Sequence, residues 1–376
     1  MNKITVFLFA FIAIAAGCGR GPKPDMSRLL KPPPGVSTDG VDYFPGGVAL
    51  KPGDILLGRS YGTMGAIFAN FGSLPGKYSH AALYYRDSSG CGRVINIRPL
   101  GMDICGVAEY FSRYNRLALV RYRQPLDEQK ICQSAQRWFE IDRSARIKPD
   151  YRLNRYDHSE LFCLELVSVI FTENGLPDPF AKTYKVIDNP AAAYIVRELK
   201  LDITEIPSPN SVLEEPAFKV IAEWLRPDYD IREEIMHNTL VETLAGYFTD
   251  GYEVRNVRLG GRIKIKLLLT HFRFKRLFIA TRRRFPPLPM ALGMRSLGVG
   301  YMIYQHISCT KKTVRQAYMH QPLEVCGVSE VQELTRRAAD HYRDRFYMRK
   351  SSGSESVNAT PSSFWRRTWN TGPAGE

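Results

Sequence analysis

The stretch Leu161-Phe-Cys-Leu-Glu-Leu-Val-Ser-Val-Ile-Phe171 decides the fold. Its apolar residues surround the helical axis almost completely, which is typical of a helix at the centre of a core. Gly175 supplies an end for this helix, and Asp157 or Ser159 can cap its start. Cys163 is therefore expected in the first turns of a buried helix, where free N–H groups and the helix dipole favour a thiolate.

Two apolar segments upstream supply an imidazole and an amide. His80-Ala-Ala-Leu-Tyr-Tyr85 predicts a strand, and Val94-Ile-Asn-Ile97 predicts the strand that returns beside it. The polar, glycine-containing segment between them predicts a turn centred near Ser88. Antiparallel pairing about that turn would place Asn96 opposite His80.

Cysteine, imidazole and an orienting amide are the components of a thiol nucleophile site. We interpret Cys163 as the nucleophile, His80 as the general base and Asn96 as the residue that orients the imidazole. The first N–H groups of the helix could receive an oxyanion. Each residue also has a structural interpretation: an inert buried cysteine, a histidine at a strand edge, and an amide on a solvent-facing surface.

Four further residues are supporting candidates. His158 lies five positions before Cys163 and competes for the role of base. Glu165 projects from another side of the helix, as a structural or substrate-contacting carboxylate. Tyr78 is a candidate for lining the cleft, and Asp103 is an alternative third residue. No His/Cys pair has zinc spacing and no glycine-rich phosphate loop follows a strand, so we expect neither a metal nor a cofactor.

The N-terminal segment predicts export. A basic start precedes the apolar run Thr5–Ala16, which is too short to span a membrane comfortably. Ile14-Ala-Ala-Gly-Cys18 resembles the bacterial lipobox, which implies a signal peptide over 1–17 and a diacylglycerol on Cys18. Gly19 then favours an outer-membrane lipoprotein that faces the periplasm of the bacterial cell envelope. The alternative is an ordinary secretory signal with an incidental cysteine.

The composition fits a packed, exported protein with an anionic partner. The chain has 376 residues, 44% of them hydrophobic, and a formal net charge of +14. This excess suggests phospholipid, cell-wall polymer or nucleic acid as a contact, and export argues against nucleic acid. An oxidising compartment permits disulfides. Cys91 with Cys105, and Cys309 with Cys326, are conceivable pairs.

Beyond the signal peptide predicted over 1–17, the chain divides into four segments by composition. Residues 18–45 are rich in Pro, Gly and Ser and predict a flexible tether. Residues 46–210 carry the candidate site, and 211–350 form a basic region of unknown role. Within it, 262–284 holds nine Lys/Arg and no acid, interleaved with Leu and Phe. That segment could lie on anionic lipid, or be a basic face packed within a second domain. Residues 351–376 predict a disordered tail.

Other elements follow from local patterns. Leu50–Leu57 predicts a turn and a buried strand, and residues 117–123 predict a further strand. Asp127–Asp142 has helical spacing, with an apolar face formed by Ile131, Ala135 and Trp138.

Five short motifs together resemble the permuted NlpC/P60-type cysteine hydrolases of the YiiX/YebB kind. The motifs are Pro52-Gly-Asp-Ile-Leu56, Ser79-His-Ala-Ala-Leu83, Val94-Ile-Asn96, Phe162-Cys-Leu-Glu-Leu-Val167 and Ile206-Pro-Ser-Pro209. The resemblance implies an α+β, circularly permuted papain-like fold, in which an antiparallel sheet packs on a central Cys-bearing helix. We expect an α-rich C-terminal extension beyond it. By this resemblance Cys163 matches the nucleophile and His80 the base. The family usually has Glu where Asn96 stands, and often Ser where Leu164 stands.

The resemblance implies a hydrolase of amide, peptide or ester bonds. The predicted envelope location favours peptidoglycan stem peptides as the substrate. A lipid acyl hydrolase or acyltransferase is the alternative that the basic segment 262–284 suggests. A non-catalytic envelope scaffold is a third reading, which the Asn96 departure permits.

Overall fold

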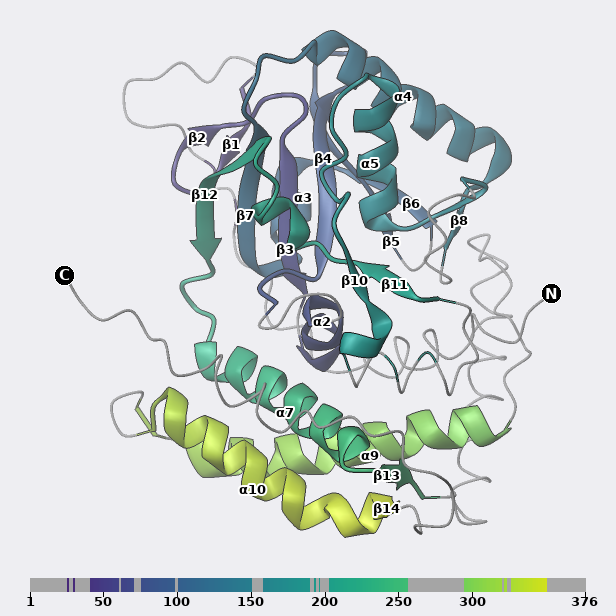
Figure 1. Ribbon diagram of the computed structural model, residues 1–376. Helices are drawn as coiled ribbons and strands as arrows, with labels where there is room; N and C mark the ends of the chain where they lie inside the picture. Colours follow the sequence, from purple (N-terminus) through teal and green to yellow (C-terminus); the bar gives the residue numbers. More distant parts are fainter. Residues whose placement is uncertain are drawn as a thin grey trace, which may run out of the picture.

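The computed structural model describes residues 41–60, 62–70, 76–98, 101–150, 158–189, 203–255, 294–319 and 326–349, with a few isolated positions (Figure 1). A six-stranded antiparallel sheet organises the first part, with the strand order β12-β7-β3-β4-β5-β6. Its strands are β3 (Ile55–Ser60), β4 (His80–Arg86), β5 (Gly92–Arg98), β6 (Gly101–Cys105), β7 (Tyr114–Tyr122) and β12 (Phe218–Leu225). Strand β12 lies beyond the expected domain boundary at 210, so the sheet extends into the segment assigned to the C-terminal region.

Both faces of the sheet are covered, which explains why its strands read as continuous apolar runs. Ile55, Ala81 and Leu83 point into a core shared with helices α4 and α5. Their neighbours Leu56 and Ala82 point into a second core on the opposite face. Alternate residues of one strand therefore serve two cores.

Helix α4 (Glu128–Ala145) forms as its pattern predicts. Asp127 caps it by accepting a hydrogen bond from the backbone N–H of Lys130 at 3.1 Å. The predicted apolar face is buried: its residues are Ile131, Ala135 and Trp138.

Helix α5 (Cys163–Glu173) is the buried central helix that was expected, but its cap differs. Phe162 is the N-cap, and its backbone N–H donates to the Glu165 carboxylate at 3.4 Å. Ser159 does not cap it, because the chain first forms the short strand β9 (Glu160–Leu161), paired with β8 (Lys148–Pro149). The other expected cap, Asp157, lies outside the described residues.

The second face of the sheet is covered by short elements. These are α3 (Val107–Phe111) and the paired strands β1 (Tyr43–Phe44) and β2 (Val48–Ala49). Phe44 and Met26 are both buried in this core. Part of the segment predicted as a tether over 18–45 is thus packed against the domain.

An α-rich unit follows the sheet, as expected. It contains α7 (Ile231–Thr249), α9 (Met294–Tyr318) and α10 (Val328–Phe346), with the strand pair β13 (Tyr252–Val254) and β14 (Tyr347–Arg349). Figure 1 shows these helices below the sheet, with α2 (Gly62–Ala69) between the sheet and α7. The remaining short elements are β10 (Thr183–Lys185), β11 (Glu205–Pro207) and the 3-10 turns Val186–Asp188 and Ser211–Leu213.

Buried charge joins the two parts. Arg59, at the end of β3, is 2% exposed and donates to Asn238 Oδ1 on α7 at 2.5 Å. Arg116 on β7 lies 3.4 Å from the Glu234 carboxylate of the same helix. Polar side chains from the sheet therefore hold α7 in place.

The six cysteines that the structure describes are free thiols. The conceivable pairs Cys91–Cys105 and Cys309–Cys326 are therefore not formed. Among the described residues, no helix is long and apolar enough to cross a membrane. Cys18, the basic segment 262–284 and the tail 351–376 lie outside the described residues.

Candidate active site

Cys163 is the first residue of α5, where the helix meets the beginning of β4. The thiol is half-buried. The backbone N–H groups of Ala81, Leu164 and Cys163 itself face its sulfur. Burial raises the pKa of the Cys163 thiol, while these three N–H groups lower it. The sulfur thus lies in an apolar site that already contains hydrogen-bond donors for a thiolate.

His80, the first residue of β4, directly precedes Ala81. Its Nε2 atom lies 3.1 Å from Oδ1 of Asn96, a fully buried amide on β5. Burial lowers the pKa of His80 to about 4, although the bond to Asn96 raises it. The imidazole is therefore neutral at neutral pH and available as a base.

The two strands meet in a register that differs by two positions from the prediction. Leu83 pairs with Ile95 and Tyr84 with Val94, so the same register places Asn96 across from Ala82 rather than from His80. An even shift keeps Asn96 and His80 on the same face of the sheet. The imidazole reaches the amide diagonally.

Asn96 also defines which imidazole nitrogen carries the proton. Its Nδ2 donates to the backbone oxygen of Asp103 at 3.1 Å and to the Asp103 carboxylate at 3.3 Å. The amide nitrogen is therefore turned towards β6, and the amide oxygen towards His80. An oxygen can only accept, so Nε2 carries the hydrogen and Nδ1 keeps its lone pair.

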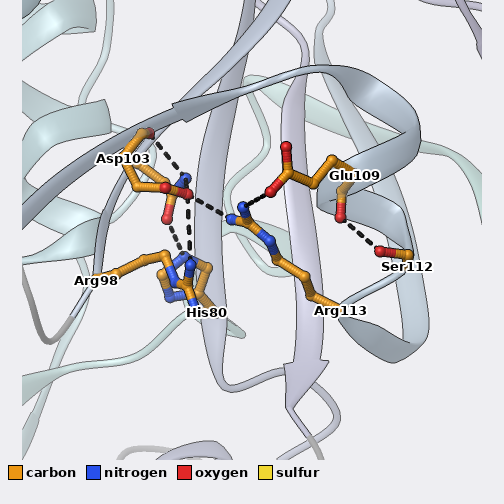
Figure 2. A network of polar contacts seen from close by, with 7 residues as sticks. His80, Arg98, Asp103, Glu109, Ser112 and Arg113 are labelled. Atoms are coloured by element: carbon orange, nitrogen blue, oxygen red, sulfur yellow. Dashed lines mark hydrogen bonds and ion pairs between the residues drawn. The ribbon is translucent and has the colours of Figure 1, made fainter. Parts of the chain in front are cut away.

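A charged network continues beyond the amide (Figure 2). Arg113 contacts the Asp103 carboxylate and donates to Glu109 at 2.7 Å. Arg98 lies 3.8 Å from the same Asp103 carboxylate. Asp103, proposed from the sequence as an alternative third residue, instead lies behind Asn96 and holds it.

An aromatic wall surrounds the imidazole. The ring of Tyr114 stacks on His80 with centroids 5.7 Å apart and planes at 19°, and Tyr110 lies behind it at 6.5 Å. Gly58 makes this stacking possible, because a Cβ there would meet the Tyr114 ring at 2.6 Å. The ring restricts the imidazole to one orientation.

The other supporting candidates have structural contacts. His158 Nδ1 lies 2.7 Å from Glu165 Oε1, and Glu165 also caps α5. The two residues interact with each other, and among the described contacts neither is hydrogen-bonded to His80 or Cys163. Tyr78 is fully buried, and its hydroxyl donates to Glu223 on β12 at 2.6 Å. The Tyr78 hydroxyl is therefore hydrogen-bonded to β12 and is not free to line the cleft.

Four residues near the imidazole were not predicted from the sequence: Arg98, Tyr110, Arg113 and Tyr114. Arg98 carries a usable signal, because it follows Asn96 by two positions and so shares its face of β5. Arg113 and Tyr114 reach the site only through the turn after α3, which no local pattern in the sequence specifies.

Comparison with known proteins relates one segment of the chain to a family. Residues 49–222 match the model of a family described as "Permuted papain-like amidase enzyme, YaeF/YiiX, C92 family". Residues 49–222 thus match the permuted papain-like amidases, a family of cysteine hydrolases that act on amide bonds.

One solved structure is similar: the crystal structure of metalloprotein yiiX from Escherichia coli O157:H7, DUF1105. It is 16% identical, with a TM-score of 0.39, over 46% of this chain and 98% of that chain. None of the curated proteins matches significantly. Among the residues described in this chain, no group of three or more His, Cys, Asp or Glu could hold a metal ion.

Proposed function

We propose that the chain is a lipid-anchored cell-envelope amidase in which Cys163, His80 and Asn96 form the catalytic triad. The observation that carries this proposal is the pairing at one end of the sheet. The Cys163 sulfur faces the N–H of Ala81, and the residue before Ala81 is a histidine whose tautomer is fixed by Asn96. An inert core cysteine would not need a neutral base, held in one tautomer, beside it.

The proposed reaction starts with proton transfer from the Cys163 thiol to Nδ1 of His80. The thiolate forms a bond to the carbonyl carbon, and the carbonyl electrons move to the oxygen, near the N–H of Cys163. Collapse of this intermediate breaks the C–N bond as His80 protonates the leaving amine. Water then attacks the thioester, gives its proton to His80 and releases the acid and the free thiol.

In the described residues the thiol and the imidazole are not hydrogen-bonded to each other. Such bonds are often long in unliganded enzymes and shorten when substrate binds. The Cys163 sulfur already lies near Tyr110 and Tyr114, the two rings that pack against His80.

For the substrate, we propose the peptide stem of peptidoglycan. Support comes from the sequence: the lipobox-like Ile14–Cys18 and the export signal would place the enzyme beside the cell wall. The formal charge of +14 suits an anionic polymer. A lipid acyl hydrolase or acyltransferase is the second candidate, supported by the basic and aromatic segment 262–284.

The test is product formation by the full-length protein from purified muropeptides and from phospholipid vesicles. Wild type is expected to release a new amine from muropeptides, and Cys163→Ala is not. Products from phospholipid alone would select the second candidate. No product from either, together with full complementation of a deletion strain by Cys163→Ala, would favour a non-catalytic envelope scaffold.

A further inference from the structure

Arg98 is a solvent-accessible cation beside the imidazole. It is the last residue of β5, and the strand register places it across from His80 on the same face of the sheet. In Figure 2 the two side chains overlap in the view, and the charge of Arg98 acts on the His80 imidazole. The side chain of Arg98 is 47% exposed, whereas that of Arg113 is 15% exposed. Of the two cations near His80, Arg98 is the one that a substrate can reach.

The donors of Arg98 are not used by the neighbouring carboxylate. Asp103 is contacted by Arg113 and accepts from Asn96 at 3.3 Å. Arg98 remains 3.8 Å from Asp103, beyond hydrogen-bond distance. Within the part of the chain that the structure describes, the Arg98 guanidinium makes no hydrogen bond. Its planar fork of N–H groups fits the two oxygens of a carboxylate or phosphate.

The charges around the imidazole favour an anion. Arg98 has the largest effect among the charged neighbours of His80 and lowers its pKa, Asp103 raises it, and Arg113 lowers it again. Arg113 is paired with both Asp103 and Glu109, so Arg98 is the cation of this network that is left to meet an anion. The N-terminus of α5 adds further positive potential at Cys163. A neutral substrate would gain no binding energy from this positive potential.

We infer that Arg98 binds a carboxylate or phosphate group of the substrate close to the bond that Cys163 attacks. This inference rests on the proposed function and adds a substrate class to it: acyl compounds with an anionic group near the scissile bond. Free carboxylates of peptides and phosphates of lipid headgroups share this chemistry.

The test is the charge selectivity of Cys163 alkylation in the full-length protein. Rates with anionic iodoacetate and neutral iodoacetamide are measured by mass spectrometry of the peptide that contains Cys163. The exposed Cys91 in the same molecule gives the intrinsic ratio of the two reagents. Wild type is expected to favour iodoacetate at Cys163, and Arg98→Gln to lower the ratio about three- to tenfold. The preference should weaken as salt is raised.

Two variants separate charge from structure. Arg98→Lys keeps the cation and should keep most of the preference. Arg93→Gln removes a cation from the other end of β5, where Arg93 pairs with Asp87 at 2.8 Å, and should leave the Cys163 ratio unchanged. An iodoacetate ratio that is the same in wild type and Arg98→Gln would overturn the inference. Slow reaction of Cys163 with both reagents would instead overturn the proposed function.

Protection from iodoacetamide identifies the source of the anion. A short peptide with a free α-carboxylate is compared with its amide, and short-chain phosphatidylglycerol with phosphatidylcholine. Protection by one anionic member, lost in Arg98→Gln, supports the inference and assigns that source. Equal protection by charged and neutral members, or protection that Arg98→Gln leaves intact, contradicts it.

Discussion

The Nε2 atom of His80 and the Oδ1 atom of Asn96 lie 3.1 Å apart, and the amide is held from behind by Asp103. This arrangement leaves Nδ1 as the basic nitrogen of a buried, neutral imidazole. The candidate site therefore has an amide at the position where the resemblance implies a glutamate.

Two substitutions of Asn96 change the imidazole in different ways. Asn96→Leu removes the acceptor that fixes the tautomer, and we expect hydrolysis to fall by about 10- to 100-fold. Asn96→Asp places a carboxylate beside the Nε2–H group of His80, and this negative charge should raise the pKa of His80 above its value of about 4. Imidazole ¹⁵N chemical shifts measured against pH report both effects. Identical shifts and rates in all three proteins would refute the orienting role.

Gly58→Ala tests the stacking of Tyr114 on His80. The added Cβ would meet the Tyr114 ring at 2.6 Å, so the ring must move away from the imidazole. We expect a loss of about 1–3 kcal/mol in the free energy of unfolding, together with slower alkylation of Cys163. Gly106→Ala is the control, because a Cβ there meets nothing within 4 Å. Equal stability of the two variants would contradict the packing.

Asn238→Ala tests how the C-terminal helices are attached. The variant leaves the buried Arg59 guanidinium without its acceptor on α7, while its bond to the Gly76 carbonyl at 3.0 Å remains. A charged group that loses one buried acceptor costs about 2 kcal/mol in the free energy of unfolding. Asn238→Asp supplies a carboxylate and should retain most of the stability. Urea denaturation measures the series, and an unchanged midpoint for Asn238→Ala would refute the contact.

Buried histidines make stability depend on pH. Burial lowers the pKa of His80 and of His306 to about 4, against 6.5 in an unfolded chain. Between these values the unfolded chain binds protons that the folded chain does not, so the contribution of these histidines to stability is complete above pH 6.5 and is lost as the pH falls towards 4. Each histidine accounts for about 3 kcal/mol of this loss. Glu242 acts in the opposite direction, because burial raises its pKa to about 7.

His306 isolates one of these contributions. Its ring lies between α9 and α10, where Nε2 is 2.9 Å from the carbonyl oxygen of Ala339. His306→Gln cannot titrate, so its unfolding free energy should change less between pH 7 and pH 5 than that of wild type. Urea midpoints at the two pH values measure the difference. The same change in both proteins would show that His306 is not the titrating group.

Much of the fold followed from local patterns. The apolar surround of Leu161–Phe171 predicted a buried helix, and the spacing of Ile131, Ala135 and Trp138 predicted the buried face of α4. Both signals depend only on the spacing of apolar residues along a short stretch of the sequence. The hairpin was also predicted, but its predicted register was wrong by two positions, because the turn composition allows more than one centre. Because the register shift is an even number of positions, Asn96 stays on the same face of the sheet as His80, and the two side chains remain neighbours.

Features that depend on distant contacts could not be predicted. The cap of α5 is Phe162 because a parallel pairing with Lys148–Pro149 delays the start of the helix. Arg113 reaches Asp103 through the turn after α3. Attachment of α7 depends on Arg59, whose acceptor lies far along the chain at Asn238. Each of these is fixed by tertiary packing rather than by local preference.

The most direct test of the central claim is the pH dependence of Cys163 alkylation by iodoacetamide in wild type and in His80→Ala. Since burial raises the pKa of the thiol, rapid reaction at pH 6.5 requires the neutral imidazole to accept its proton. We predict that wild-type Cys163 reacts about 100-fold faster than His80→Ala at pH 6.5, and that the difference shrinks above pH 9. The exposed Cys91 should react equally in both proteins. Superimposable profiles for Cys163 would contradict the thiol–imidazole pair.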